Sequence, residues 1–221
     1  MMLFQQAVLK FTLGVVLIAA LLLLPAGTWC YWNAWLLMGL LFIPMFIAGL
    51  VMLKKSPELL KSRLKAKESE GEQQLVIKLS GLMFLCGFIV AGLDFRFGWS
   101  HLPRWLIIAA SIAFLLAYAL YAEVLRENVW LSRTIEVQEN QTVIDTGLYG
   151  IVRHPMYAAT LTLFGSMPLV LGSIPAFLIF LCYPLIIAKR IRNEEEVLLR
   201  ELNGYGDYMQ RVKYRLIPHI W

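Results

Sequence analysis

Long apolar runs dominate this chain, and they constrain its fold more than any other feature. Each run is close to or longer than the roughly 20 apolar residues that a transmembrane helix needs. The runs cover about 7–24, 33–53, 75–93, 104–125 and 156–188. Apolar residues make up 59% of the chain and charged residues 16%, whereas soluble domains have about 45–50% and about 25%. The sequence therefore predicts an all-α, polytopic integral membrane protein, and it excludes a soluble domain, a disordered chain and a disulfide scaffold.

The last apolar run, 156–188, is too long for a single crossing of the membrane. It is interrupted by residues 171–175, which read Leu-Gly-Ser-Ile-Pro, and Gly-Ser followed by Pro is typical of a turn. We therefore expect a tight helical hairpin here, which gives about six transmembrane crossings in total. The first run lacks the basic start and the cleavage site of a secretory signal, so we interpret it as a crossing as well.

Basic residues predict the orientation of these crossings. With six crossings, one side of the membrane holds the segments 1–10, 54–78, 126–153 and 189–221. Of the 20 Lys and Arg residues, only Arg96 and Arg104 lie on the other side. Because Lys and Arg concentrate in cytoplasmic loops, we expect both termini in the cytoplasm. The membrane would be the inner membrane of a bacterium or the endoplasmic reticulum of a eukaryote. The net charge of +5 then reflects topology and anionic lipid headgroups, and no nucleic-acid partner is expected.

Polar residues concentrate in two stretches that flank the hairpin, 126–157 and 189–221. We therefore divide the chain into four N-terminal transmembrane helices, 1–125, and a catalytic region, 126–221. This region comprises a cytoplasmic loop, the hairpin, and a cytoplasmic C-terminal helix with a lid over 197–221. A site built there meets the bilayer and the cytoplasm together, which suits a water-soluble cofactor and a lipid-like substrate. The sequence has no metal-ligand spacing and no glycine-rich nucleotide motif, so neither a metal site nor a Rossmann or P-loop domain is expected.

The first polar stretch contains Gly147-x-Tyr149, followed by Arg-His-Pro-Met-Tyr at residues 153–157. Proline is favoured in the first turn of a helix, so the first helix of the hairpin should begin at His154 or Pro155. Its N-terminus would lie at the cytoplasmic surface and would favour an anionic group. The alternative is an interfacial anchor without a ligand, because Arg and Tyr are common where a span leaves the membrane.

The second polar stretch continues the last span into the cytoplasm and carries Glu194, Glu195 and Glu196 in a row. Arg190 lies four residues before Glu194, so both share one face of a helix. We interpret the arginine as a site for a carboxylate substrate and the glutamate as a site for the amine or hydroxyls of a cofactor. The alternative is a solvated helix face on which Arg190, Arg192 and Arg200 balance the three carboxylates.

Taken in order, these motifs resemble the isoprenylcysteine carboxyl methyltransferase family. The resemblance rests on three motifs: Gly147-x-Tyr149, Arg153-His154-Pro155-x-Tyr157 and Arg190-x-x-x-Glu194-Glu195-x-x-Leu198. The downstream Gly204-Tyr205-x-x-Tyr208 and the ending at 214–218 are similar to bacterial members. The motifs cover about 126–221, whereas the N-terminal half matches only as hydrophobic spans.

The resemblance implies a membrane transferase that uses S-adenosyl-L-methionine to methylate the carboxylate of a prenylcysteine-like or other lipidic acceptor. By position, it implies that Arg190 and Glu194 are catalytic, and that Arg190 and Arg153 bind the substrate. The residues implied in cofactor binding are Gln141, Thr142, Val143, Ile144, Tyr149, His154, Pro155, Met156, Tyr157, Glu194 and Glu195. Glu196 leaves the register of the acidic pair open by one residue. A carboxylate is already ionised at pH 7, so the reaction needs an arginine to hold it but no general base.

Three other functions are compatible with parts of the sequence. A phospholipid N-methyltransferase shares the general architecture, although Arg190 would be an awkward neighbour for a cationic amine. A membrane sterol reductase would use NADPH and a sterol. A small membrane scaffold or transporter subunit would bind no cofactor. The natural methyl acceptor and the oligomeric state do not follow from the sequence.

Overall fold

The computed structural model describes residues 2–64, 71–131 and 137–221. Their regular elements are all helices, which confirms the predicted all-α class. Lys65, Lys67 and Arg133, which the charge pattern assigns to the cytoplasmic side, lie outside the described residues.

The N-terminal half forms the four long helices that the apolar runs predicted. These are α1 (Met2–Ala26), α2 (Trp32–Lys55), α4 (Gly71–Phe97) and α5 (Arg104–Glu127). All four contain stretches long and apolar enough to cross a membrane. A short helix, α3 (Pro57–Leu64), follows α2.

The C-terminal apolar run forms the predicted hairpin, with α6 (Pro155–Val170) as its first arm. The second arm consists of α7 (Ile174–Phe180) and α8 (Tyr183–Glu201), which together form the fifth candidate span, Ile174–Glu201. The turn between the arms places Gly172 at φ +77°, a conformation that glycine adopts without strain. With 16 residues, α6 is about 24 Å long at 1.5 Å per residue. It is therefore shorter than the hydrocarbon core of about 30 Å, and it packs beside α5.

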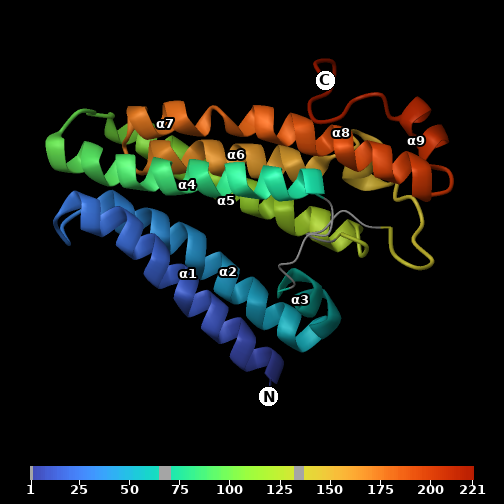
Figure 1. Ribbon diagram of the computed structural model, residues 1–221, viewed down its shortest axis with the longest axis horizontal. Helices are drawn as coiled ribbons and strands as arrows, with labels where there is room; N and C mark the ends of the chain where they lie inside the picture. Colours follow the sequence, from blue (N-terminus) through green and yellow to red (C-terminus); the bar gives the residue numbers. More distant parts are fainter. Residues whose placement is uncertain (1, 65–70, 132–136) are drawn as a thin grey trace.

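The helices run back and forth, so the connections alternate between the two ends of the bundle (Figure 1). The turns after α1, α4 and α6 lie together at one end, at the left of the figure. Hydrogen bonds join them there: Tyr31 Oη donates to Leu171 O at 2.7 Å, and the Ile174 N–H donates to Ser100 Oγ at 3.1 Å. The segment α3, residues 137–154 and the C-terminal tail lie toward the other end. Among the described residues, five helical stretches are long and apolar enough to cross a membrane, and α6 is not one of them, so the six predicted crossings stay a prediction.

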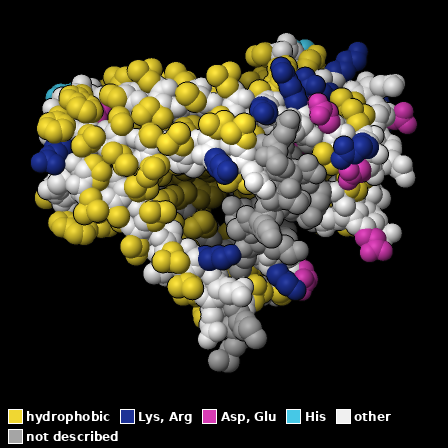
Figure 2. All heavy atoms as spheres, in the orientation of Figure 1, with side chains coloured by type: hydrophobic (Ala, Val, Ile, Leu, Met, Phe, Trp, Pro, Cys, Tyr) yellow, Lys and Arg dark blue, Asp and Glu magenta, His cyan; other side chains and the backbone are white. Residues whose placement is uncertain are grey.

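Close helix packing holds the bundle together at the end with the turns. Gly92 in α4 lies against α1, where an added Cβ would sit 2.5 Å from Leu22 O. Gly87, also in α4, faces the ring of Phe180 so closely that a Cβ would overlap it. The outer surface of the helices is apolar, and Lys, Arg, Asp and Glu side chains gather mainly at the end opposite the turns (Figure 2). The chain is a polytopic membrane protein, and the polar end of its bundle holds the candidate site.

Candidate functional site

A cavity lies at the polar end of the bundle. Its wall comes from the segment after α5, the loop before α6, the start of α6, the C-terminal part of α8, and α9 (Tyr205–Arg211). Most of the predicted site residues line it: Gln141, Thr142, Val143, Ile144, Tyr149, Arg153, His154, Met156, Tyr157, Arg190 and Glu194. The structure therefore brings together two stretches that lie some forty residues apart in sequence. Pro155 and Glu195 are the two predicted site residues outside this lining.

Local sequence explains how the loop before α6 reaches the cavity. Residues Gly147–Gly150 form a 3-10 turn, η1, and the Leu148 N–H donates to Glu127 Oε2 at 2.9 Å. Gly147 has φ +53°, and a Cβ at this position would overlap the Glu127 carboxylate. Glycine is required here for two reasons, the left-handed backbone and the close approach of Glu127 from the end of α5.

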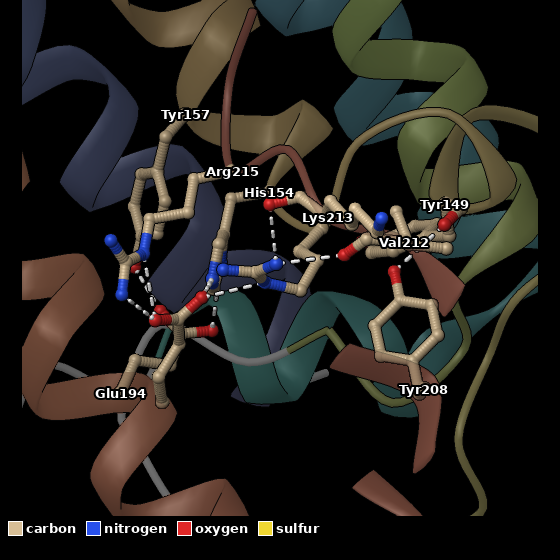
Figure 3. Close-up of polar contacts among 10 residues, drawn as sticks. Tyr149, His154, Tyr157, Glu194, Tyr208, Val212, Lys213 and Arg215 are labelled. Carbon is tan, nitrogen blue, oxygen red and sulfur yellow. Dashed lines mark hydrogen bonds and ion pairs between the residues drawn. The ribbon is translucent and has the colours of Figure 1, made fainter. Parts of the chain in front are cut away.

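Hydrogen bonds hold Tyr149 both at its side-chain hydroxyl and at its backbone carbonyl. Asn128 Nδ2 donates to its hydroxyl oxygen at 3.0 Å. Tyr208 Oη donates to its backbone carbonyl at 2.7 Å (Figure 3). Tyr149 is buried. The loop that carries this predicted cofactor residue is therefore fixed by the end of α5 on one side and by α9 on the other.

Tyr157 connects Arg190 to Glu194 across the hairpin. Arg190 Nε donates to Tyr157 Oη at 2.9 Å, and the same hydroxyl donates to Glu194 Oε2. His154 Nδ1 lies 4.0 Å from Glu194 Oε1. Arg190 and Glu194 are partly buried and line the cavity. These contacts differ from the solvated helix face that was the alternative interpretation of this stretch.

Glu195 sits in a buried charge cluster behind the cavity wall. Its side chain is 4% exposed, and it accepts from Arg153 Nε at 2.8 Å and from Arg215 Nε at 2.8 Å. His154 Nε2 lies 3.3 Å from Glu195 Oε1. Because two guanidinium groups neutralise one carboxylate, the charge is compensated without any ligand. Glu196 is exposed, so the geometry separates the three consecutive glutamates into a cavity residue, a buried residue and a surface residue.

Arg153 lines the cavity, but its guanidinium contacts other parts of the protein. Besides Glu195, its Nη1 donates to the carbonyls of Val212 at 2.7 Å and of Lys213 at 2.9 Å. These partners belong to the C-terminal tail. The geometry favours a positioning role for Arg153 and Glu195, whereas the resemblance implied that they bind substrate and cofactor.

The C-terminal tail pairs with the start of α6. The N–H groups of Arg153 and His154 donate to the carbonyls of Tyr214 and Arg215, both at 2.9 Å. The predicted lid over 197–221 therefore has two parts. The first part, as far as Tyr208, contributes to the cavity wall. The second part packs against residues 153–154 and braces them from behind.

Several residues that line the cavity were not among the predicted site residues: Asn128, Trp130, Leu131, Leu198, Leu202, Tyr205 and Tyr208. Leu198, Tyr205 and Tyr208 stood in motifs that supported the family resemblance, and their helical spacing could have placed them on one wall. Asn128 and Trp130 lie in an irregular segment, where no periodicity indicates which side chain faces the cavity.

The two tyrosines of α9 are neutral in this environment. Burial raises the pKa of the Tyr205 hydroxyl above its ordinary value, and the charges of Glu195 and Glu194 raise it further. Burial also raises the pKa of Tyr208. Both hydroxyls therefore remain protonated donors at neutral pH. Within the described residues, no group of three His, Cys, Asp or Glu side chains could hold a metal ion.

Two comparisons with known proteins find similar sequences, and the first of them agrees with the resemblance seen in the motifs. Residues 105–200 match the isoprenylcysteine carboxyl methyltransferase (ICMT) family. The chain is also 30% identical over 91 residues to the Delta(14)-sterol reductase TM7SF2 of Mus musculus; the match covers 40% of this chain and 22% of that protein. The chain thus spans less than a quarter of the curated relative that it matches. The predicted resemblance is confirmed over residues 105–200, from α5 through most of α8, by their match to the isoprenylcysteine carboxyl methyltransferase family.

Proposed function

We propose that the protein is an S-adenosyl-L-methionine-dependent carboxyl O-methyltransferase, and that its acceptor is a prenylcysteine-like or other lipidic carboxylate at the cytoplasmic membrane surface. The observation that carries the proposal is the meeting of the family motifs around one cavity. Arg190, Glu194 and Tyr157 form its polar end, and the loop 141–144 faces them.

The residues that line the cavity suit the chemistry of the proposed cofactor. Glu194 and His154 offer partners for an amine and for hydroxyls. Val143, Leu198 and Leu202 offer an apolar surface for an adenine ring. When bound, the cofactor supplies an electrophilic sulfonium methyl group.

Arg190 would hold the acceptor carboxylate for attack on that methyl group. A planar guanidinium can donate to both carboxylate oxygens, and an acceptor ionised at pH 7 needs no base to become a nucleophile. In the transfer a carboxylate oxygen–methyl bond forms and the sulfur–methyl bond breaks, which leaves a neutral thioether. The contribution of the protein is then orientation, a term that can reach roughly 7–11 kcal/mol. Tyr157 supports this role because it fixes Arg190 Nε relative to Glu194.

We place the cavity and both termini on the cytoplasmic side. Lys54, Lys55, Lys189 and Arg192 lie near the same end of the bundle as the cavity, and basic residues favour the cytoplasmic face. A reporter fused after Trp221 should therefore read as cytoplasmic. An extracytoplasmic signal would overturn the assigned orientation.

Cofactor binding and methyl transfer test the proposal in turn. The purified protein in detergent should be stabilised by S-adenosyl-homocysteine as RT ln(1 + [L]/Kd). With radiolabelled S-adenosyl-L-methionine and a small prenylcysteine analogue, the product should be an ester that alkali hydrolyses. A flat thermal response at saturating ligand would favour a scaffold. Alkali-stable label in phospholipid would favour a phospholipid N-methyltransferase.

A sterol reductase is the second candidate, and the 30% identity over 91 residues to the mouse Delta(14)-sterol reductase is the observation that favours it. That relative is much longer than this chain, so the shared segment covers only 22% of it. A reductase of this kind would be stabilised by NADPH in the same thermal assay, whereas the proposed methyltransferase would respond to S-adenosyl-homocysteine alone.

A further inference from the structure

Tyr205, at the start of α9, carries a buried hydroxyl without a hydrogen-bond partner among the described residues. The residue is 4% exposed, and it lines the cavity. Buried polar atoms in folded proteins nearly always have a partner, because an unpaired one costs free energy. An unpaired hydroxyl at the wall of a binding cavity therefore points to a partner that arrives with the ligand.

Tyr208, three residues further on, has the opposite bonding. It is also buried, and its ring centre lies 5.6 Å from that of Tyr205. Its hydroxyl, however, donates to the backbone carbonyl of Tyr149 at 2.7 Å. The two tyrosines share a helix, a degree of burial and a cavity wall, so they differ mainly in whether the protein itself satisfies the hydroxyl.

The surroundings of Tyr205 indicate which end of a ligand it would meet. Along α8 the cavity residues Arg190, Glu194 and Leu198 follow every four residues, so each step is about 6 Å at 1.5 Å per residue. The cavity therefore changes from polar at Arg190 to apolar about 12 Å further along the helix. The ring of Tyr205 packs in an apolar cluster with Leu202, with Val143 and Leu198 beside it, while its hydroxyl lies near enough to Glu194 and Glu195 for their charges to raise its pKa.

We propose that the Tyr205 hydroxyl binds the adenosyl end of the cofactor by donating a hydrogen bond to one of its acceptor atoms. The apolar wall suits the face of a purine, and the ring nitrogens of a purine and the oxygens of its ribose accept hydrogen bonds. The amino-acid end of the cofactor would then lie toward Glu194 and Arg190. This inference rests on the proposed function and adds a binding residue to it.

Tyr205→Phe and Tyr208→Phe, made in the full chain, form the matched test. For each variant the melting temperature is measured without ligand. Dissociation constants are then measured for S-adenosyl-homocysteine and for 5′-methylthioadenosine, which keeps the adenosyl part but lacks the amino acid.

Tyr205→Phe should leave the ligand-free melting temperature unchanged or higher, because it removes an unpaired buried group. It should weaken both ligands by about 3- to 10-fold, as expected for one hydrogen bond. Tyr208→Phe should lower the ligand-free melting temperature, because it leaves the Tyr149 carbonyl unpaired.

Each other outcome has a definite meaning. If the wild-type protein binds neither ligand, the proposed function fails and this inference fails with it. If the wild-type protein binds both and Tyr205→Phe binds them equally well, the inference alone is wrong. Weaker binding of S-adenosyl-homocysteine with unchanged binding of 5′-methylthioadenosine would assign the hydroxyl to the amino-acid end and overturn the proposal. A ligand-free melting temperature lowered as much as in Tyr208→Phe would indicate a structural role instead.

Discussion

Glu194 and Glu195 are neighbours in sequence but serve different parts of the protein. The Glu194 carboxylate accepts from the Tyr157 hydroxyl at the cavity, and the Glu195 carboxylate lies between the guanidinium groups of Arg153 and Arg215 (Figure 3). Consecutive residues of an α-helix point about 100° apart, so one pair of glutamates can face a ligand and a buried ion cluster at once.

Arg190→Ala should reduce methyl transfer by about 100-fold or more, the usual cost of losing a charged group that orients a reaction. Binding of S-adenosyl-homocysteine should change by less than about 3-fold, since Glu194 and the loop 141–144 remain. Incorporation of label into alkali-labile ester and titration calorimetry measure the two effects. Arg192→Ala is the control, because Arg192 is exposed two residues further along α8 and should behave as wild type. Full turnover in Arg190→Ala would contradict the assigned role.

Glu194→Gln should weaken S-adenosyl-homocysteine by about 10- to 100-fold, because hydrogen bonds to a charged group contribute about 1.5–3 kcal/mol. Its melting temperature without ligand should stay close to that of wild type, since the Gln side chain can still accept from Tyr157. Glu196→Gln removes the same charge from an exposed position on the same helix and should bind normally. Equal affinities in the two variants would show that the cavity carboxylate does not contact the cofactor.

Glu195→Gln should unfold more easily than wild type, by about 3 kcal/mol or more. Removing one partner of a buried ion pair leaves the other charge uncompensated, and the Arg153 side chain is only 5% exposed. Thermal unfolding in detergent measures the loss. Glu201→Gln is the control, because Glu201 pairs with Arg200 at an exposed position, where such pairs contribute about 0–1 kcal/mol. A Glu195→Gln protein that is as stable as wild type but fails to bind cofactor would instead support the binding role that the resemblance implied.

Gly147→Ala should destabilise the protein by about 1–3 kcal/mol, since it combines a left-handed backbone with an overlap of Cβ and the Glu127 carboxylate. The change should also weaken cofactor binding, because Gly147 begins the turn that carries Tyr149. Adding Glu127→Ala should recover part of the stability by removing the overlap, although the backbone strain would remain. Gly165→Ala in α6 is the control, with no atom within 4 Å of its Cβ. A Gly147→Ala protein as stable as this control would contradict the steric argument.

Sequence alone was sufficient for the features that depend on local pattern. The apolar runs predicted the four N-terminal helices, and residues 171–175 predicted the turn of the hairpin, which lies between Val170 and Ile174. Pro155 predicted the start of α6 correctly. The motifs predicted the family resemblance, because the residues of each motif lie within a short segment of the chain. Each of these conclusions needs only residues that are close together in sequence.

Tertiary structure decided which side chains meet. Arg215 reaches Glu195 across 20 residues, and Tyr208 reaches Tyr149 across 59. No helical or turn periodicity spans such separations, so the sequence could not tell which residues of the predicted lid line the cavity or that the tail braces residues 153–154.

Contacts between residues distant in sequence also explain why the roles of Glu194, Glu195 and Glu196 could not be predicted. The sequence showed three adjacent carboxylates of equal chemistry, and it left open which two of them form the acidic pair of the motif. Only packing against α6 and the tail directs Glu194 to the cavity, buries Glu195 and leaves Glu196 exposed. The sequence therefore determined the membrane fold and the family resemblance of residues 105–200, because apolar periodicity and short motifs are local. The division of the polar residues between ligand and scaffold came from tertiary contacts, because burial depends on segments that are distant along the chain.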